Sequence, residues 1–189
     1  METNSLNESV ALGGLMQLLG RLLVEELNPE LIDILTQPDV LAVFGQADPD
    51  CVAYLSQTWD AAAYEQAAVD YCHLFILPKG VAPMASAWTE NAENLSIQIQ
   101  QSVASLRTSV DLALPEAFGA LPEEHAGLLL FIAGRLAFAE DPDIREQAPP
   151  FLQATAASWL GKFSDALAGS TTGPFYRSVG ILLRQLHAC

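Results

Sequence analysis

Near the N-terminus, apolar residues recur every three or four positions, the spacing of one face of an α-helix. Glu25 and Glu26 lie off this apolar face. The pattern predicts a first helix whose apolar stripe consists of Leu12, Leu15, Met16, Leu19, Leu22, Leu23 and Leu27. The next residues, Asn28, Pro29 and Glu30, have the order of a helix start, with an N-cap, a proline and an acid, and predict a short second helix to about Leu35.

Prolines and helical spacing divide the remaining sequence into further helices. Pro38 and Pro49 mark short ones, and a long one is predicted from Thr58 to Phe75 because proline at position 78 cannot continue a helix. Its apolar face consists of Tyr64, Ala67, Ala68, Tyr71, Leu74 and Phe75. Later helices are predicted over residues 88–113, 126–139, 151–167 and 174–186.

No stretch of alternating, β-branched residues predicts a sheet, and no internal repeat is present. We therefore expect an all-α fold, a single-domain helical bundle that spans residues 1–189. At this length one domain buries roughly 70% of the surface of its unfolded chain, so one good core is expected.

The chain has a formal net charge of −15, from 23 acids and eight bases. Residues 1–106 contain 14 of the acids and only two of the bases. This charge repels nucleic-acid phosphates and anionic lipids and favours a cationic partner near the N-terminal half. The simpler interpretation, that the acidity keeps the protein in solution, stays open.

The cysteine and histidine positions predict neither a disulfide framework nor a metal site. The chain has an odd number of cysteines, Cys51, Cys72 and Cys189, and none of them has CxxC spacing. This pattern favours a reduced, cytoplasmic protein. The three histidines show no metal-ligand spacing, and no glycine-rich phosphate loop is present, so we expect no cofactor. The N-terminus does not have the pattern of a secretory signal, and the apolar run Ala126–Gly134 is too short for stable membrane insertion.

The loop that follows the long helix is unusually apolar for a surface segment. Residues 77–87 contain two prolines and a glycine but almost no charge. Loops are usually polar because they lie in water, so this one is expected either to pack into the core or to bind a partner.

Three motifs occur in a fixed order along the chain. The first has Tyr71, Leu74, Phe75 and Pro78; the second has Pro83, Met84, Ser86 and Trp88; the third has Pro122, Glu123, Glu124 and His125 just before an apolar helix. Phe151, Leu152, Trp159 and the run from Phe175 to Arg177 follow. In this order and spacing, from about Leu15 to the C-terminus, the sequence resembles the TorD/DmsD family of redox-enzyme maturation chaperones.

The sequence departs from the family pattern at three positions. Ala85 replaces a usual acid in the loop, Glu124 replaces the aspartate of an Asp-His pair, and Thr155 stands where many members have histidine. These changes are typical of a divergent branch of the family.

The resemblance implies a cytoplasmic chaperone that is not an enzyme and has no catalytic residues. Such a protein binds the twin-arginine signal peptide, or a folding intermediate, of a molybdenum-cofactor oxidoreductase subunit and holds it for cofactor insertion before export. Glu123 and Glu124 would bind the arginines, because carboxylates match guanidinium groups. The apolar part of the leader would contact an apolar groove. The other site residues that the resemblance implies are Tyr71, Leu74, Phe75, Pro78, Pro83, Met84, Trp88, Pro122 and His125.

Other interpretations of the same residues stay open. Tyr71, Leu74 and Phe75 have the spacing of an ordinary core face, and acids near a helix start also complement its dipole. The partner is alternatively the mature part of the enzyme subunit. Two further hypotheses are a helical small-ligand protein or enzyme that uses Glu124 and His125 as acid and base, and a structural subunit. The protein is expected to be a monomer or a domain-swapped dimer.

Overall fold

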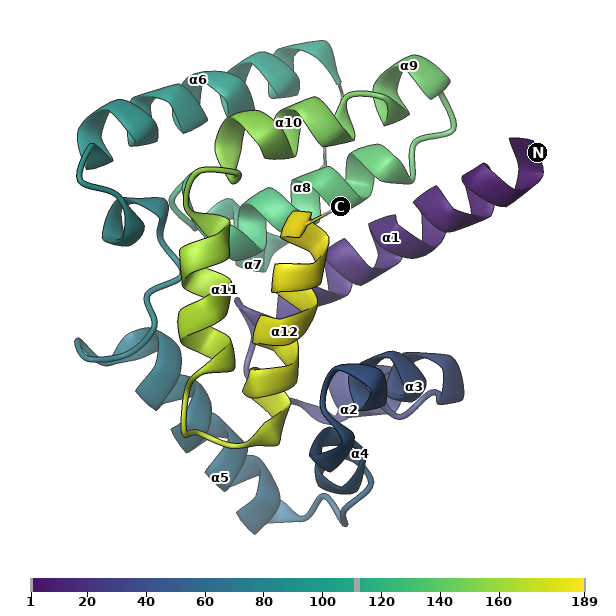
Figure 1. The fold of residues 1–189 in the computed structure, drawn as a ribbon, viewed down its shortest axis with the longest axis vertical. Coiled ribbons are helices and arrows are strands. Elements are labelled where there is room, and N and C mark those ends of the chain that lie inside the picture. The colour runs from purple at the N-terminus through teal and green to yellow at the C-terminus, as the bar shows by residue number, and fades with distance from the viewer. Residues whose placement is uncertain (1, 111–112, 189) are drawn as a thin grey trace. The chain divides into compact units, whose positions relative to one another are not determined.

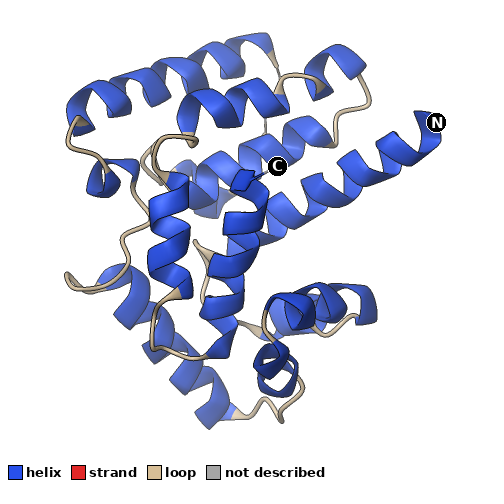
Figure 2. Cartoon of the chain, in the orientation of Figure 1, coloured by secondary structure: helices blue, strands red, loops and turns tan. Residues whose placement is uncertain are grey.

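The computed structural model describes residues 2–110 and 113–188, and the side chains of residues 10–108, 110 and 113–187. Within these ranges the chain is built from helices, turns and loops, and no strand forms (Figures 1 and 2). The predicted all-α fold is therefore confirmed. Among the described residues, no helix is both long and apolar enough to cross a bilayer.

Two compact units make up the chain, and each combines two separate stretches of sequence. Unit 1 contains Met1–Glu25 and Pro83–Trp159, and unit 2 contains Glu26–Ala82 and Leu160–Cys189. The prediction of one domain over residues 1–189 stays a prediction.

Unit 1 is organised around α8, the most apolar helix of the chain. Eleven of its twelve residues are buried, and α1, α9 and α10 pack against it. On the outer side, α6 packs on α10 and on a short 3-10 turn, η2 (Figure 1). The elements of unit 1 are α1 (Glu2–Leu22), η2 (Ala85–Trp88), α6 (Ala92–Ser109), α7 (Glu116–Gly119), α8 (Ala126–Ala137), α9 (Pro142–Arg145) and α10 (Ala148–Thr155).

Glycines let α1 and α8 approach each other closely. A Cβ atom added at Gly134 would lie 2.6 Å from the backbone oxygen of Gly13, and one added at Gly20 would lie 2.7 Å from the backbone oxygen of Gly127. Real Cβ atoms essentially never come so close to backbone atoms. The two pairs run in opposite order along the two helices, so α1 and α8 are antiparallel and meet along a seam of glycines.

Unit 2 contains the helices before and after the large insertion of unit 1. Its helix starts follow the sequence rules: Asn28 accepts a hydrogen bond from the Leu31 amide at 3.0 Å, and Asp60 accepts one from the Ala63 amide at 3.0 Å. Its elements are α2 (Pro29–Leu35), α3 (Pro38–Ala47), α4 (Pro49–Leu55), α5 (Ala61–Tyr71), the π-helical turn η1 (Cys72–Ile76), α11 (Leu160–Ala168) and α12 (Pro174–Ala188).

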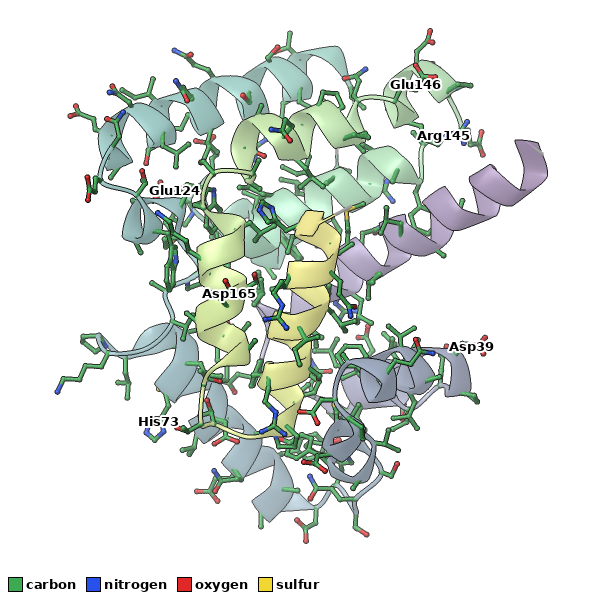
Figure 3. All side chains as sticks on the ribbon, viewed as in Figure 1. Asp39, His73, Glu124, Arg145, Glu146 and Asp165 are labelled. Atoms are coloured by element: carbon green, nitrogen blue, oxygen red, sulfur yellow. The ribbon has the colours of Figure 1, made fainter. Side chains whose placement is uncertain are left out.

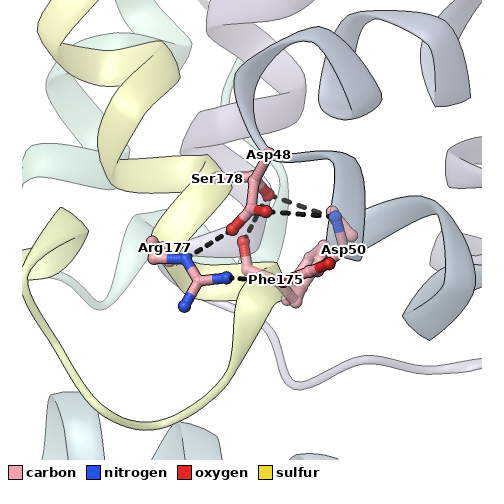
Figure 4. Close-up of polar contacts among 6 residues, drawn as sticks. Asp48, Asp50, Phe175, Arg177 and Ser178 are labelled. Atoms are coloured by element: carbon pink, nitrogen blue, oxygen red, sulfur yellow. Dashed lines mark hydrogen bonds and ion pairs between the residues drawn. The ribbon is translucent and has the colours of Figure 1, made fainter.

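An ion pair joins α12 to the junction between α3 and α4 in unit 2 (Figure 4). The carboxylate of Asp48, 7% exposed as a residue, caps α4 by accepting from the Asp50 amide and also accepts from Arg177 Nε at 2.5 Å. This hydrogen bond from Arg177 holds the pKa of Asp48 below its usual value, against the effect of burial. Ser178, next in the sequence, donates to the sulfur of Cys51 at 3.2 Å. The run from Phe175 to Arg177, noted in the sequence, therefore has a structural role in this unit.

Aromatic rings form a connected cluster beside this ion pair. Phe175 stacks on Phe44 and Tyr54, and Tyr176 meets the edge of Phe75 with 5.3 Å between ring centroids. The Tyr176 hydroxyl is buried and has no hydrogen-bond partner among the described residues. Burial raises the pKa of Tyr176 well above its usual value, so the group stays neutral.

We expect Tyr176→Phe to raise the free energy of unfolding by about 1–2 kcal/mol, because it removes a buried hydroxyl that has no partner. Urea unfolding of the variant beside the parent protein measures the change. Tyr54→Phe is the matched control, since Tyr54 is only partly buried. A destabilised Tyr176→Phe variant would show that the hydroxyl is hydrogen-bonded in solution.

Two helix predictions are wrong in detail. Residues 151–167 do not form one helix, because the helix is interrupted between α10, which ends at Thr155, and α11, which begins at Leu160. The indole Nε1 of Trp159 donates to the Thr155 carbonyl at 2.8 Å, which takes the acceptor that a continuing helix would use. Most of the apolar stripe predicted for the first helix is buried, but Leu12 is 40% exposed, because Gly13 rather than Leu12 contacts α8 in this part of α1.

Three other helix boundaries differ from those expected. The helix predicted over 88–113 begins at Ala92, after η2, and ends at Ser109; residues 111–112 lie outside the described residues. The helix predicted over 58–75 changes to a π-helical turn at Cys72. The short helices α7 and α9 lie in stretches for which the sequence predicts no helix.

Candidate functional site

The second part of the apolar loop, residues 83–87, and the turn before α8 lie together in unit 1. Met84 and His125 form an antiparallel backbone bridge. Two hydrogen bonds flank it, from the Ala85 amide to the Glu124 carbonyl at 3.2 Å and from the Ala126 amide to the Pro83 carbonyl at 2.8 Å. The second and third sequence motifs are thus joined by their main chains, independently of their side chains.

Glu124, labelled in Figure 3, is held at this junction by two hydroxyl groups from other elements. Ser86 Oγ, from η2, donates to Oε1 at 2.6 Å, and Ser96 Oγ, from the first turns of α6, donates to Oε2. The side chain is only partly buried. A carboxylate has about four acceptor sites, so two serine bonds fix its orientation and leave room for a further donor such as a guanidinium group.

His125 has a structural task within the turn. Its Nδ1 accepts a hydrogen bond from the Gly127 amide at 3.1 Å, and the residue is the N-cap of α8. Burial lowers the pKa of His125 to about 4. The imidazole is therefore neutral at physiological pH, and the ring nitrogen that would act as a base is already in use.

The two acids of the turn precede α8, which begins at the residue that the sequence predicts. The first residue of α8 is Ala126, and its first turn contains no acid. Glu123 and Glu124 precede the N-cap, and serine hydroxyls rather than helix amides bind the Glu124 carboxylate. The interpretation that these two acids complement the dipole of the helix stays a prediction.

The apolar residues of the loop divide between core and surface. Pro83 and Ala85 are buried, which places the alanine that replaces the usual family acid inside the protein. Met84 and Trp88 are half-buried, and Pro122 is exposed. Met84, which is paired with His125 across the bridge, and Trp88, which shares η2 with Ser86, therefore retain surface for contact.

The remaining predicted site residues belong to unit 2. Tyr71 and Leu74 are buried, whereas Phe75 is half-buried and Pro78 exposed. The loop here is tight, since the Val81 amide donates to the Leu74 carbonyl at 2.6 Å. These residues form a group of their own within this unit, and their part in ligand binding stays a prediction.

Two exposed residues beside this group were not predicted. Ile76 and Leu77 are 65% and 46% exposed, which is unusual for large aliphatic side chains. The low charge of residues 77–87 was the signal that pointed to Leu77, but sequence alone did not decide which residues of the loop face outward. Ile76 precedes the loop, at the end of η1.

Ser96 is the residue of the site that sequence analysis missed. It lies 28 positions before Glu124, inside a helix whose stripe was identified only from its apolar residues. A serine within an amphipathic helix has no distinguishing sequence signal. Ser86, in contrast, stands in a motif that the resemblance had already singled out.

The sequence model for the nitrate reductase delta subunit matches residues 39–165. No individual curated protein matches the chain. The family match confirms the resemblance to maturation chaperones and covers both the loop and the turn. It also overturns the hypothesis of an enzyme that uses Glu124 and His125 as acid and base. The chain therefore belongs to the nitrate reductase delta subunit family, whose members are chaperones in the maturation of molybdoenzymes and are not enzymes themselves.

Proposed function

We propose that this chaperone acts in the cytoplasm and binds the twin-arginine leader of a nitrate reductase-type molybdoenzyme subunit at the junction of η2, α6 and the turn before α8. The observation behind the proposal is the Glu124 carboxylate, oriented by Ser86 and Ser96 and still partly exposed. Through this binding the chaperone would hold the enzyme subunit until its cofactor is inserted.

The chemistry of the junction suits such a leader in two ways. A leader of this class joins two arginines to an apolar stretch, and an arginine fork binds a fixed carboxylate through paired hydrogen bonds. The half-buried thioether of Met84 adapts to varied apolar side chains, and Trp88 adds an aromatic surface. A carboxylate beside apolar surface is the combination that this ligand requires.

Calorimetric titration with a synthetic leader from a molybdoenzyme encoded near this protein tests the proposal. We expect Glu124→Gln to weaken binding about tenfold, because the substitution keeps the shape and removes the charge that the guanidinium contacts. A leader with both arginines replaced by lysine should bind the parent protein more weakly, since lysine lacks the planar fork.

Glu116→Gln is the matched control, because Glu116 is an exposed acid of the same unit that lies outside the junction. It should leave leader affinity unchanged. Absence of leader binding to the parent protein would refute the proposal. Binding of a leaderless subunit with the same affinity as the full subunit would instead show that the mature part is the ligand.

A further inference from the structure

A groove lies on the outer side of unit 1, between α6 and α10. Its volume is about 680 Å³. None of the residues singled out by the sequence motifs except Phe151 lines it. The lining residues are Gln98, Gln101, Ser102, Ser105, Leu106, Gln147, Pro150, Phe151 and Ala154.

None of the residues that line the groove is charged. Residues 94–106 and 147–161 contain no Asp, Glu, Lys or Arg, in a chain with 31 such residues. These stretches include most of α6 and all of α10, and the two helices pack side by side (Figures 1 and 3). Surface helices normally expose charged residues, and depletion of charge is a compositional mark of the centre of protein interfaces.

The lining groups match the hydrogen-bonding needs of a polypeptide backbone. Each glutamine amide both donates and accepts, and so does the Ser105 hydroxyl. Ser102 already donates its proton to the Gln98 carbonyl at 2.9 Å, and Gln147 donates to the Asp143 carbonyl at 3.2 Å, so Ser102 offers a ligand only an acceptor. Along α6 these side chains follow one another at intervals of three or four residues, so their Cβ atoms are about 5–6 Å apart. Two residues of an extended chain span about 6.6 Å, a similar repeat.

From Gln98 to Leu106 the groove follows α6 for about 12 Å, enough for about four extended residues. Phe151 and Leu106, 7% and 6% exposed, provide a small apolar floor. We propose that this groove binds an extended, uncharged segment of a partner polypeptide. The absence of lysine and arginine leaves acidic segments without a counter-ion, and the absence of Asp and Glu does the same for basic ones.

The groove is separate from the Glu124 junction. On α6, Ser96 and Gln98 point about 160° apart around the helix axis, because successive residues turn by about 100°. Ser96 contacts Glu124 on one flank of the buried face of α6, and the groove follows the other flank. The two sites can therefore be altered one at a time.

Titration of the full-length protein followed by NMR of glutamine side-chain amides tests the proposal. The probe is a capped peptide of about ten residues made only of Ser, Gln, Ala and Leu, sufficient to span the groove. We expect saturable shifts of the amide signals of Gln98, Gln101 and Gln147. Raising the salt from about 50 mM to about 500 mM should leave the affinity unchanged, because no charges are involved.

Gln101→Glu should weaken this binding about tenfold, because it places a charge in the groove that the peptide cannot pair. Gln100→Glu is the matched control: the same change at the next, equally exposed residue of α6, which does not line the groove. Neither variant should change affinity for a twin-arginine leader, so failure of one site is distinguishable from failure of the other.

Absence of saturable shifts at the three glutamines, or equal effects of Gln101→Glu and Gln100→Glu, would overturn the inference. So would self-association of the protein that is abolished by Gln101→Glu, since the occupant would then be a second copy of the chain. A peptide bearing two glutamates in place of two glutamines should bind more weakly than the uncharged probe. Equal affinity for both would also count against an uncharged ligand.

Discussion

Gly134→Ala is expected to lower the free energy of unfolding by about 2 kcal/mol, although alanine is the better helix former by about 1 kcal/mol. The new methyl group would lie 2.6 Å from the Gly13 backbone oxygen and 2.6 Å from Gln17 Cγ. Backbone atoms cannot move aside without separating α1 from α8, so the whole seam must open. Urea unfolding followed by circular dichroism measures the loss.

Gly14→Ala is the matched control on the partner helix. A Cβ atom at Gly14 would meet only the ring of Phe138, at 3.7 Å, which is an ordinary contact. The same chemical change should therefore raise stability by up to about 1 kcal/mol through helix propensity. Equal effects of the two substitutions would show that the glycine seam does not form in solution.

Acidification from pH 7 to about pH 4.5 is expected to destabilise the protein through His125. Its pKa is about 4 when folded, against 6.5 when unfolded, so below pH 6.5 the unfolded chain takes up a proton that the folded chain does not. Above about pH 6.5 this residue does not lower the free energy of unfolding. Its protonation in the unfolded chain lowers that free energy progressively as the pH falls from 6.5 towards 4. The difference in pKa corresponds to about 3 kcal/mol when the titration is complete.

His125→Asn separates this effect from the titration of carboxylates. Asparagine is a good N-cap, and its side-chain oxygen can accept from the Gly127 amide as Nδ1 does in the parent protein. The variant has a different stability at pH 7, so the measured quantity is the slope of unfolding free energy against pH. A slope between pH 6.5 and pH 4.5 as steep as that of the parent would contradict the assignment.

The sequence was sufficient to predict the all-α class and most helix starts, because these depend on local chemistry. The Asn28 cap and the prolines at positions 29, 38, 49 and 174 mark observed helix starts. The association of the apolar loop with the turn at Glu124 followed from the family resemblance. Propensity, caps and proline act over a few residues, so a single sequence contains them.

Features that depend on particular side-chain contacts could not be predicted in this way. The indole of Trp159 ends α10 by donating to the carbonyl of Thr155, four residues earlier, although the apolar spacing here is that of a continuing helix. The burial of α1 through its glycines rather than through Leu12 depends on which helix packs against it. The serine that orients Glu124 from α6 likewise depends on a contact across 28 positions.

The glycine seam also determines when the protein can fold during synthesis. Gly13 and Gly20 leave the ribosome early, whereas their partners Gly127 and Gly134 follow only after more than a hundred residues. Unit 2 likewise needs α12 to complete the ion pair of Asp48 with Arg177. Neither unit can close before these later residues have been synthesised. The chaperone is thus itself a protein whose early helices must remain unpaired, with their apolar faces open, until α8 and α12 have left the ribosome.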